Sequence, residues 1–328
     1  MKINCITKFI LAVAVILFFQ SCEKDDNFGH TVSQITLDAS NIKKAVPSYS
    51  LSNWMGAINK NVSLSELSIP GTHDSGARYD HPFFSGTAKT QNLTIREQLN
   101  SGTRFLDIRC RHINNIFTIH HGSVYQKLNF NDVLNDCLNF LNSNPTETII
   151  MSVKEEHDPS NNRRSFEATL TSYINQNRSK WYLGENIPRL NNVRGKIVLL
   201  RRFNTRSSTP KGINATNWKD NTTFTINNTN ATLQIQDKYK ISDKNNKWNS
   251  ITSLLRAAKN GNSNTMYINF ASGYKPNWFG IPRIPEISNY INPKISSYFR
   301  NNTSGRYGSI MMDFATASRN KLLIKTNF

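Results

Sequence analysis

The stretch NPTETIIMSVKEE (144–156) contains the pattern that decides the fold class. A continuous apolar run from Thr148 to Val153 begins soon after a proline and stops at Lys154. Short unbroken apolar runs of this kind are typical of strands buried on both faces, as in a parallel sheet. The eight runs that we predict as strands are Leu64–Ile69, Arg104–Ile108, Ile116–Ile119, Thr148–Val153, Lys196–Leu200, Thr232–Ile235, Thr265–Phe270 and Ser309–Met312.

Segments with helical periodicity lie between several of these strands. The predicted helices are Leu93–Leu99, Phe130–Leu141, Arg164–Asn175, Asn249–Lys259 and Ile287–Phe299. Arg206–Asn230 lacks this period and is predicted as a long Asn/Thr-rich excursion. Strands that alternate with helices indicate parallel strands joined by crossover helices. We therefore predict a single α/β domain, an irregular (β/α)8 TIM barrel with some helices missing, and the alternative is a doubly wound open sheet.

The composition excludes several classes of protein. The 328 residues are 38% hydrophobic, which excludes disorder throughout, and 15 Gly with 4 Cys exclude a collagen-like repeat or a disulfide scaffold. The formal charge of +18 favours anionic surfaces as partners. Because the basic residues are dispersed and no binding motif occurs, we expect no nucleic-acid partner. We also expect a monomer.

The N-terminus has the features of a lipoprotein signal peptide. Lys2 and Lys8 precede an apolar run at 9–19, and Cys22 follows shortly after it. This run is too short for a membrane span, which needs about 20 residues. We therefore predict a signal over 1–21, removed to leave Cys22 as the lipid anchor; the alternative is an ordinary secretory signal. The charged residues after Cys22 resemble the surface-export signal of some outer-membrane lipoproteins, which implies an exported lipoprotein facing the cell exterior.

The remaining boundaries follow from composition. The polar segment 22–50 is predicted as a flexible tether, and 51–328 as the catalytic barrel domain. Cys110 and Cys137 remain in a compartment where a disulfide can form, but the sequence leaves their pairing open.

Almost every predicted strand stops at a charged or imidazole side chain. In chain order these residues are His73, Asp74, Asp107, Arg109, His120, His121, Lys154, Arg202, Asp237 and Asp313. In a parallel barrel the carboxyl ends of all strands open onto one face. We therefore expect these side chains to meet in one pocket.

The residue types favour cleavage of a phosphodiester by a neighbouring hydroxyl. One histidine of the pair His73 and His121 can accept the hydroxyl proton while the other protonates the leaving oxygen. Arg109 can stabilise charge on the phosphate oxygens, and no metal or cofactor is required. The mixed donors and acceptors of the other strand ends, with the aromatic ring of Tyr239, suit a polyhydroxylated ring.

The sequence also resembles a known family. The segments that carry the resemblance are SIPGTHDSGA (68–77), RFLDIRCR (104–111), IHHGSVY (119–125), NPTETIIMSVKEE (144–156), RGKIVLLRRF (194–203), QDKYK (236–240) and YINP (290–293). In this order they resemble bacterial phosphatidylinositol-specific phospholipase C from about Trp54 to Asp313. The resemblance implies an irregular TIM barrel that cleaves phosphatidylinositol to diacylglycerol and inositol 1,2-cyclic phosphate, with the inositol 2-hydroxyl as nucleophile.

The resemblance also implies roles for individual residues. His73 would be the general base, oriented by Asp313, and His121 the general acid, supported by Asp74. Arg109 would stabilise the phosphate. Metal-dependent relatives have a carboxylate and calcium in place of this arginine, so the resemblance implies calcium independence, with no metal and no cofactor.

The inositol contacts are implied in the same way. Lys154, Arg202 and Asp237 would contact the inositol hydroxyls, and Tyr239 would lie under the ring. An unsubstituted headgroup is implied, without 4- or 5-phosphate. Cys110 departs from the family pattern, because a glycine is usual there.

Two segments are predicted to contact phosphatidylinositol-containing membranes peripherally. The segment 79–90 carries Phe83 and Phe84 but no Trp, and Trp278 with Phe279 forms a second apolar cluster flanked by basic residues.

The sequence leaves two other functions open. One is a metal-dependent phosphodiesterase of glycerophosphodiester type, and the other is a surface module that binds inositol lipids without turnover. The physiological substrate also stays open among host phosphatidylinositol, glycosylphosphatidylinositol anchors and the organism's own inositol lipids.

Overall fold

The computed structural model describes residues 48–206, 208–209 and 211–328. The predicted signal 1–21, the anchor Cys22 and most of the tether lie outside the described residues. The ring of Tyr49 stacks on Phe328 with centroids 4.6 Å apart, so the fold already includes this part of the chain. Among the residues that the structure describes, no helix combines the length and apolar character that a membrane span needs.

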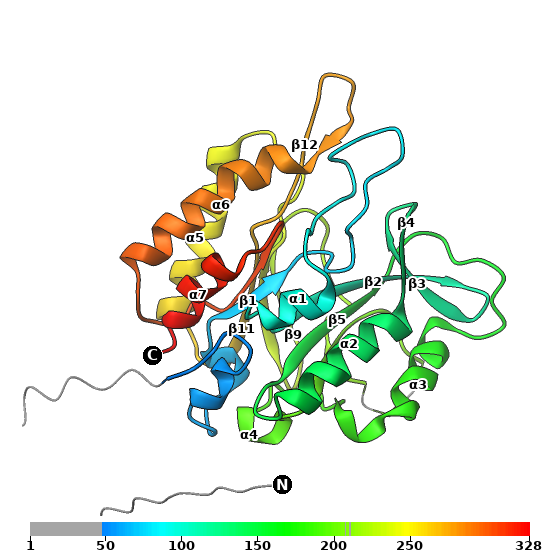
Figure 1. Cartoon of the computed structure of the whole chain (residues 1–328), viewed down its shortest axis with the longest axis horizontal. Helices are drawn as coiled ribbons and strands as arrows, with labels where there is room; N and C mark the ends of the chain where they lie inside the picture. The colour runs from blue at the N-terminus through cyan, green and yellow to red at the C-terminus, as the bar shows by residue number, and fades with distance from the viewer. Residues whose placement is uncertain (1–47, 207, 210) are drawn as a thin grey trace, which may run out of the picture. The chain divides into compact units, whose positions relative to one another are not determined.

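A curled sheet forms the centre of the molecule (Figure 1), with hydrogen-bonded strand order β6-β7-β5-β2-β1-β14-β11-β10-β9. The strands are β1 Ile69–Thr72, β2 Phe105–Ile113, β3 Ile116–His121, β4 Val124–Asn129, β5 Ile149–Glu155, β6 Trp181–Tyr182, β7 Ile197–Arg202, β8 Ile213–Asn214, β9 Thr223–Asn227, β10 Thr232–Gln236, β11 Thr265–Phe270 and β14 Ser309–Met312. A separate small ribbon pairs β12 Lys275–Pro276 with β13 Pro282–Arg283. The predicted α/β barrel sheet is thus observed.

The helices pack around the outside of this sheet (Figure 1). They are α1 Ile95–Asn100, α2 Phe130–Ser143, α3 Phe166–Gln176, α4 Leu190–Val193, α5 Lys244–Asn260, α6 Ile284–Asn301 and α7 Ala317–Lys325. Each of the five predicted helices overlaps one of them. Between β7 and β10 the described chain contains no helix, which makes the barrel irregular as predicted.

The ring of strands is not closed by backbone hydrogen bonds within the described residues. The ladder ends at β9 on one side and at β6 and β8, both paired to β7, on the other. A side-chain bond links the two sides, because the amide of Asn228 donates to the carbonyl of Asn214 at 2.7 Å. The barrel is therefore open along this seam, whereas the strand count had suggested a closed ring.

The prediction of a strand over Leu64–Ile69 was wrong for its first part. Leu64–Glu66 is a 3-10 helix, and the strand begins only at Ile69. The cause is a capping box, in which the Ser63 side chain accepts from the backbone of the first turn and Glu66 accepts from the Ser63 N–H at 2.8 Å.

The predicted strand Ile116–Ile119 exists, but it is not a parallel barrel strand. It belongs to β3, which pairs antiparallel with β2 through a two-residue turn. Asn114 and Asn115 form this turn with φ of 52° and 60°, the left-handed values that a tight hairpin requires. The long ribbon therefore carries His121 above the barrel mouth.

The predicted excursion Arg206–Asn230 also contains strands. β9 pairs antiparallel with β10 over its full length. Its alternation buries Phe224 and Ile226 and exposes Thr223 and Thr225. This period of two indicates a strand, and a search for helical period alone missed it.

Apolar residues fill both the barrel and the layers between sheet and helices. One cluster inside the barrel includes Ile69, Leu200 and Leu233. A second lies between the sheet and α2 with α3, and it contains both Cys110 and Cys137. Both cysteines are buried and free, so no disulfide joins them.

Candidate active site

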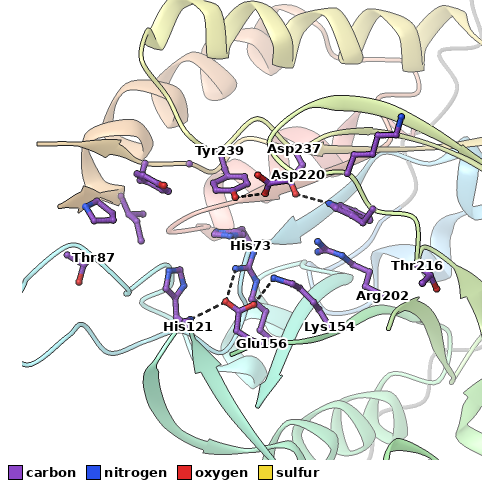
Figure 2. Close-up of a pocket in the computed structure, with 18 residues that line it drawn as sticks. His73, Thr87, His121, Lys154, Glu156, Arg202, Thr216, Asp220, Asp237 and Tyr239 are labelled. Carbon is purple, nitrogen blue, oxygen red and sulfur yellow. Dashed lines mark hydrogen bonds and ion pairs between the residues drawn. The ribbon is translucent and has the colours of Figure 1, made fainter. Parts of the chain in front are cut away.

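The carboxyl ends of the strands meet at one cavity of about 480 Å³. The predicted residues that line it are His73, Arg109, His121, Lys154, Arg202, Asp237 and Tyr239 (Figure 2). Asp74 and Asp313 lie behind the two histidines and are almost fully buried. The expected convergence is therefore observed for these strand ends. It was wrong for His120, which does not line the cavity; its ring is buried 5.5 Å from that of Tyr125.

His73 is held on both ring nitrogens. It follows β1, and its Nδ1 lies 2.7 Å from a carboxylate oxygen of Asp313, which follows the neighbouring strand β14. Its Nε2 lies 2.8 Å from Nη2 of Arg109. Because a guanidinium can only donate, Nε2 is the acceptor and Nδ1–H donates to Asp313. The one in-plane lone pair of the ring, on Nε2, therefore faces the cavity and accepts from Arg109.

His121 is paired with a buried carboxylate in the same way as His73. Its Nδ1 lies 2.6 Å from Asp74 Oδ2, and the ring stands at the end of β3. Asp74 has a φ of 37°, a conformation that non-glycine residues rarely adopt, and its N–H donates to Asp107 at 3.2 Å. The rings of His73 and His121 are 6.4 Å apart and nearly perpendicular at 85°. Two imidazoles therefore face one small volume, each with its own carboxylate.

A fixed positive charge lies next to the histidines. Arg109 Nε donates to Asp107 at 3.2 Å, and Arg202 Nη1 donates to the other oxygen of Asp107 at 3.4 Å. Burial alone would raise the pKa of Asp107, but the two guanidiniums hold it well below its usual range. Asp107 and its neighbouring carboxylates in turn raise the pKa of Arg109 despite its burial. Arg109 therefore stays charged and correctly oriented.

Glu156 lines the cavity, although we did not predict it as a site residue. It accepts from Lys154 Nζ at 2.7 Å and from the Gly122 N–H at 3.1 Å. Burial raises its pKa, but the charges of Arg109 and Lys154 outweigh this and lower the pKa of Glu156 to about 2. The sequence did indicate Glu156, because it lies two residues after Lys154 and residues two apart at the end of a strand point to the same side.

Trp218 and Asp220 also line the cavity, and both come from the excursion that was predicted as structureless. Trp218 Nε1 donates to Asp237 at 2.9 Å, and the Arg202 guanidinium stacks 3.7 Å above the Trp218 ring. Asp220 accepts from the Tyr239 hydroxyl at 2.5 Å. Burial and this carboxylate raise the pKa of Tyr239, so its phenol remains protonated. No sequence signal placed these two residues at the site.

Two loops with exposed aromatic side chains stand at the cavity mouth. Phe83 is 84% exposed, Trp278 95% and Phe279 82%. Figure 1 shows their segments, 79–90 and the β12–β13 loop, projecting from the same edge of the molecule. The Ile284 N–H donates to the Gly86 carbonyl at 2.9 Å and joins the two loops. Since Thr87 and Ile284 line the cavity, these loops border its entrance.

The first loop is shaped by one carboxylate. Asp80 accepts hydrogen bonds at 2.9–3.1 Å from four backbone N–H groups, those of Gly86, Thr87, Ala88 and Lys89. Burial would raise its pKa, but these four hydrogen bonds lower it. The loop therefore keeps its shape with Phe83 and Phe84 outward.

Four cationic side chains, three carboxylates and two imidazoles line the cavity. In the part of the chain that the structure describes, no group of three or more His, Cys, Asp or Glu residues is arranged to hold a metal ion. A barrel with two carboxylate-paired imidazoles beside a buried arginine, opening under an aromatic rim, is the arrangement expected of a barrel phosphodiesterase.

Comparison with known proteins identifies the family within this class. Residues 67–203 match the model of the phosphatidylinositol-specific phospholipase C X domain. A 1-phosphatidylinositol phosphodiesterase of Staphylococcus aureus (strain Newman) is 34% identical over 277 residues, covering 80% of this chain and 88% of the relative. The corresponding protein of Listeria monocytogenes is 30% identical over 286 residues, covering 84% of each. The chain belongs to the bacterial phosphatidylinositol-specific phospholipase C family.

Solved structures agree with this assignment. A mutant phosphatidylinositol-specific phospholipase C from S. aureus matches with a TM-score of 0.76 at 32% identity, over 85% of this chain and 98% of that one. The L. monocytogenes enzyme matches with a TM-score of 0.70 at 28% identity, over 85% of this chain and all of the other. The prediction of an irregular TIM barrel enzyme is thereby confirmed, and the two alternative functions are set aside.

Proposed function

We propose that this protein cleaves phosphatidylinositol to diacylglycerol and inositol 1,2-cyclic phosphate without a metal ion. The observation that carries the proposal is the pair His73 and His121, each bonded through Nδ1 to its own buried carboxylate, with Arg109 beside them. Named relatives of 30–34% identity are 1-phosphatidylinositol phosphodiesterases. Both lines of support point to the same reaction.

In the first half of the reaction, the Arg109 guanidinium exchanges its contact with His73 Nε2 for the phosphate oxygens, and the inositol 2-hydroxyl gives its proton to the freed Nε2. The oxygen attacks phosphorus, and a new P–O bond closes the five-membered cyclic phosphate. Asp313 fixes the tautomer of His73 and stabilises the imidazolium that forms. Arg109 donates to the non-bridging phosphate oxygens, where negative charge develops. Its contact with His73 Nε2 at 2.8 Å supports a role close to the transferred proton.

In the second half, the P–O bond to diacylglycerol breaks. The leaving oxygen takes a proton from Nε2 of His121, whose Nδ1 is held by Asp74. One proton is accepted and one is donated, so the products are neutral diacylglycerol and the cyclic phosphate anion. The perpendicular rings, 6.4 Å apart, suit an in-line displacement with base and acid on opposite sides of phosphorus.

The rest of the cavity provides the inositol subsite in this proposal. Lys154, Arg202 and Asp237 contact the ring hydroxyls, and the phenol face of Tyr239 lies against the ring. Their existing partners, Glu156 and Trp218, hold the donors and acceptors in place. A cavity of about 480 Å³ fits a cyclitol phosphate better than a protein segment.

The aromatic rim is proposed to dip into the lipid surface, with Trp278 and Phe279 as the main contacts and Phe83 as a further one. Their exposures of 82–95% would be unusual without a partner. One solved S. aureus neighbour, with a TM-score of 0.73, is described in terms of modulated membrane binding. This supports peripheral attachment for the family member studied there, and we extend it to the present chain.

We also propose that the chain is exported as an outer-membrane lipoprotein anchored at Cys22 and facing the cell exterior. The support is the sequence alone, because 1–47 lie outside the described residues. Cys22→Ala is expected to abolish incorporation of labelled palmitate and release the protein from membranes. Continued labelling of the variant would contradict the anchor.

The activity is tested with mixed micelles of phosphatidylinositol in excess EDTA, with phosphatidylcholine as the control lipid. We expect cyclic inositol phosphate, seen by phosphorus NMR, from the inositol lipid alone. Turnover only after added calcium would overturn the role of Arg109. No turnover under either condition would overturn the proposed activity.

A further inference from the structure

Lys247 is a buried cation outside the cavity that the proposed chemistry does not use. It lies in the first turn of α5 and is only 2% exposed. Its Nζ contacts three oxygens: the carbonyl of Phe270 at 2.5 Å, the carbonyl of Lys238 at 2.6 Å and Oε1 of Gln236 at 3.2 Å. Lysine is almost never fully buried without such partners, so this arrangement needs a reason.

The three contacts require the charged form of the side chain. An ammonium group has three N–H donors, and here each donor has one acceptor. A neutral amine has two donors, and its lone pair would face one of the oxygens. Loss of the proton therefore removes one of the three bonds and adds repulsion at the same place.

These oxygens belong to the carboxyl ends of two adjacent strands. Lys238 lies between Asp237 and Tyr239, which line the cavity, and follows β10. Phe270 is the last residue of β11, and its ring packs edge-on against His73 with centroids 6.0 Å apart. The side chain of Gln236 completes the link, because its Nε2 donates to the Phe270 carbonyl at 2.8 Å.

We propose that Lys247 is a positioning residue whose ammonium joins the carboxyl ends of β10 and β11 and so holds Asp237 and Tyr239 in place for the headgroup. The inference rests on the proposed function for its substrate, an inositol ring. It does not require Lys247 to touch the substrate. The same link keeps Phe270 packed on His73, so the headgroup subsite and the base are held by one side chain.

The surrounding charges make this link sensitive to pH. Burial lowers the pKa of Lys247 to about 7, although Asp237 and Asp313 oppose the shift and Lys238 adds to it. On the exposed side of the same helix, Lys244 is already paired with Glu286 at 3.0 Å. Below the pKa the ammonium makes all three bonds, and above it one is lost. The subsite should therefore loosen as pH rises through neutrality.

The test compares KM and kcat from about pH 6 to about pH 9 for the wild type, Lys247→Met and the exposed control Lys259→Met, which lies on the same helix. We expect the wild-type KM to rise with pH. In Lys247→Met we expect KM to be about tenfold higher and to lack this rise, because small displacements of binding groups cost up to about 100-fold. Lys259→Met should behave as the wild type.

A wild-type KM and pH profile in Lys247→Met would overturn the proposal. If that variant does not fold, nitrogen-15 lysine NMR on the wild type replaces it. A protected ammonium signal should disappear over the same pH range in which KM rises, and a signal that does not follow KM would overturn the proposal. Calorimetric binding of myo-inositol by the same proteins separates this outcome from failure of the proposed cleavage, because binding needs no turnover.

Discussion

The two ends of the barrel both contain buried ion pairs, but they are built differently. At the amino ends of β2 and β5, Arg104 and Glu147 pair at 2.8 Å with both side chains 0% exposed. The Arg104 guanidinium donates to four backbone carbonyls besides Glu147, and Glu147 accepts from the backbone of Met55 and Gly56. Every hydrogen-bonding group of this pair is used inside the protein.

At the carboxyl ends the pairing is incomplete. Among the described residues, Asp74 Oδ1 and Arg202 Nε are buried without a hydrogen-bond partner, and Arg109 reaches Glu156 only at 3.7 Å. Unsatisfied buried polar groups cost stability, and a bound headgroup can offset this cost at the carboxyl ends by completing the pairing there. From this contrast we expect the buried ion pair at the amino ends to matter mainly for stability and the ion pairs at the carboxyl ends mainly for function.

The largest expected effect is at the carboxyl end. His73→Ala and His121→Ala should each lower kcat about 100- to 10,000-fold, the usual contribution of a positioned acid or base. Stability should fall less than when an ion pair closed to solvent is broken, because water can enter the open cavity and solvate Asp313 or Asp74 after the ring is removed. The matched control is His157→Asn, an exposed histidine outside the cavity. A fully active His73→Ala enzyme would contradict the proposed mechanism.

At the amino end the opposite result is expected. Glu147→Ala leaves the Arg104 guanidinium buried and unpaired, which should lower the free energy of unfolding by about 3–5 kcal/mol. Activity per folded molecule should be retained, since neither residue lines the cavity. Urea unfolding and turnover on the same sample check both statements. A stable but inactive variant would show that the two ends are not separate in function.

Substitutions in the aromatic rim should have a smaller effect, and only on substrate that lies in a membrane. Trp278→Ala with Phe279→Ala should reduce binding to phosphatidylinositol vesicles at least about tenfold, because full burial of an aromatic ring contributes about 1.5–3 kcal/mol and these rings enter the lipid surface only in part. Cleavage of a soluble inositol phosphodiester should stay unchanged. Ile116→Ala, on the 47% exposed apolar residue of β3, is the control. Equal losses on vesicles and soluble substrate would mean that the rim shapes the cavity instead.

The smallest effect concerns stability at low pH. The pKa of Glu156 is about 2 in the fold against an ordinary value of 4.5. Its contribution to stability is therefore complete above about pH 4.5 and is lost as pH falls toward 2. Glu156→Gln should flatten the fall in stability across this window, as measured by urea unfolding at each pH. An unchanged slope would mean that Glu156 is not ionised by its neighbours.

The comparison also shows what could be predicted about the site. His73, Arg109, His121 and Lys154 were found because each stands where an apolar run stops, and a parallel barrel gathers such positions. The same argument could have predicted Glu156, which lies two residues after Lys154. Trp218 and Asp220 could not be predicted in this way, because their segment shows no hydrophobic period that would place it beside the cavity.

The sequence by itself determined that apolar strands alternate with helices, and that two histidines, an arginine and several carboxylates end those strands. These are local properties, set by side-chain burial and strand period. Only the tertiary structure decided that β3 and β9 run antiparallel, that the strand ring stays open at β8 and β9, and that Lys247 joins β10 to β11 from outside. Strand direction and long-range contacts depend on which surfaces meet, and a one-dimensional pattern does not record that.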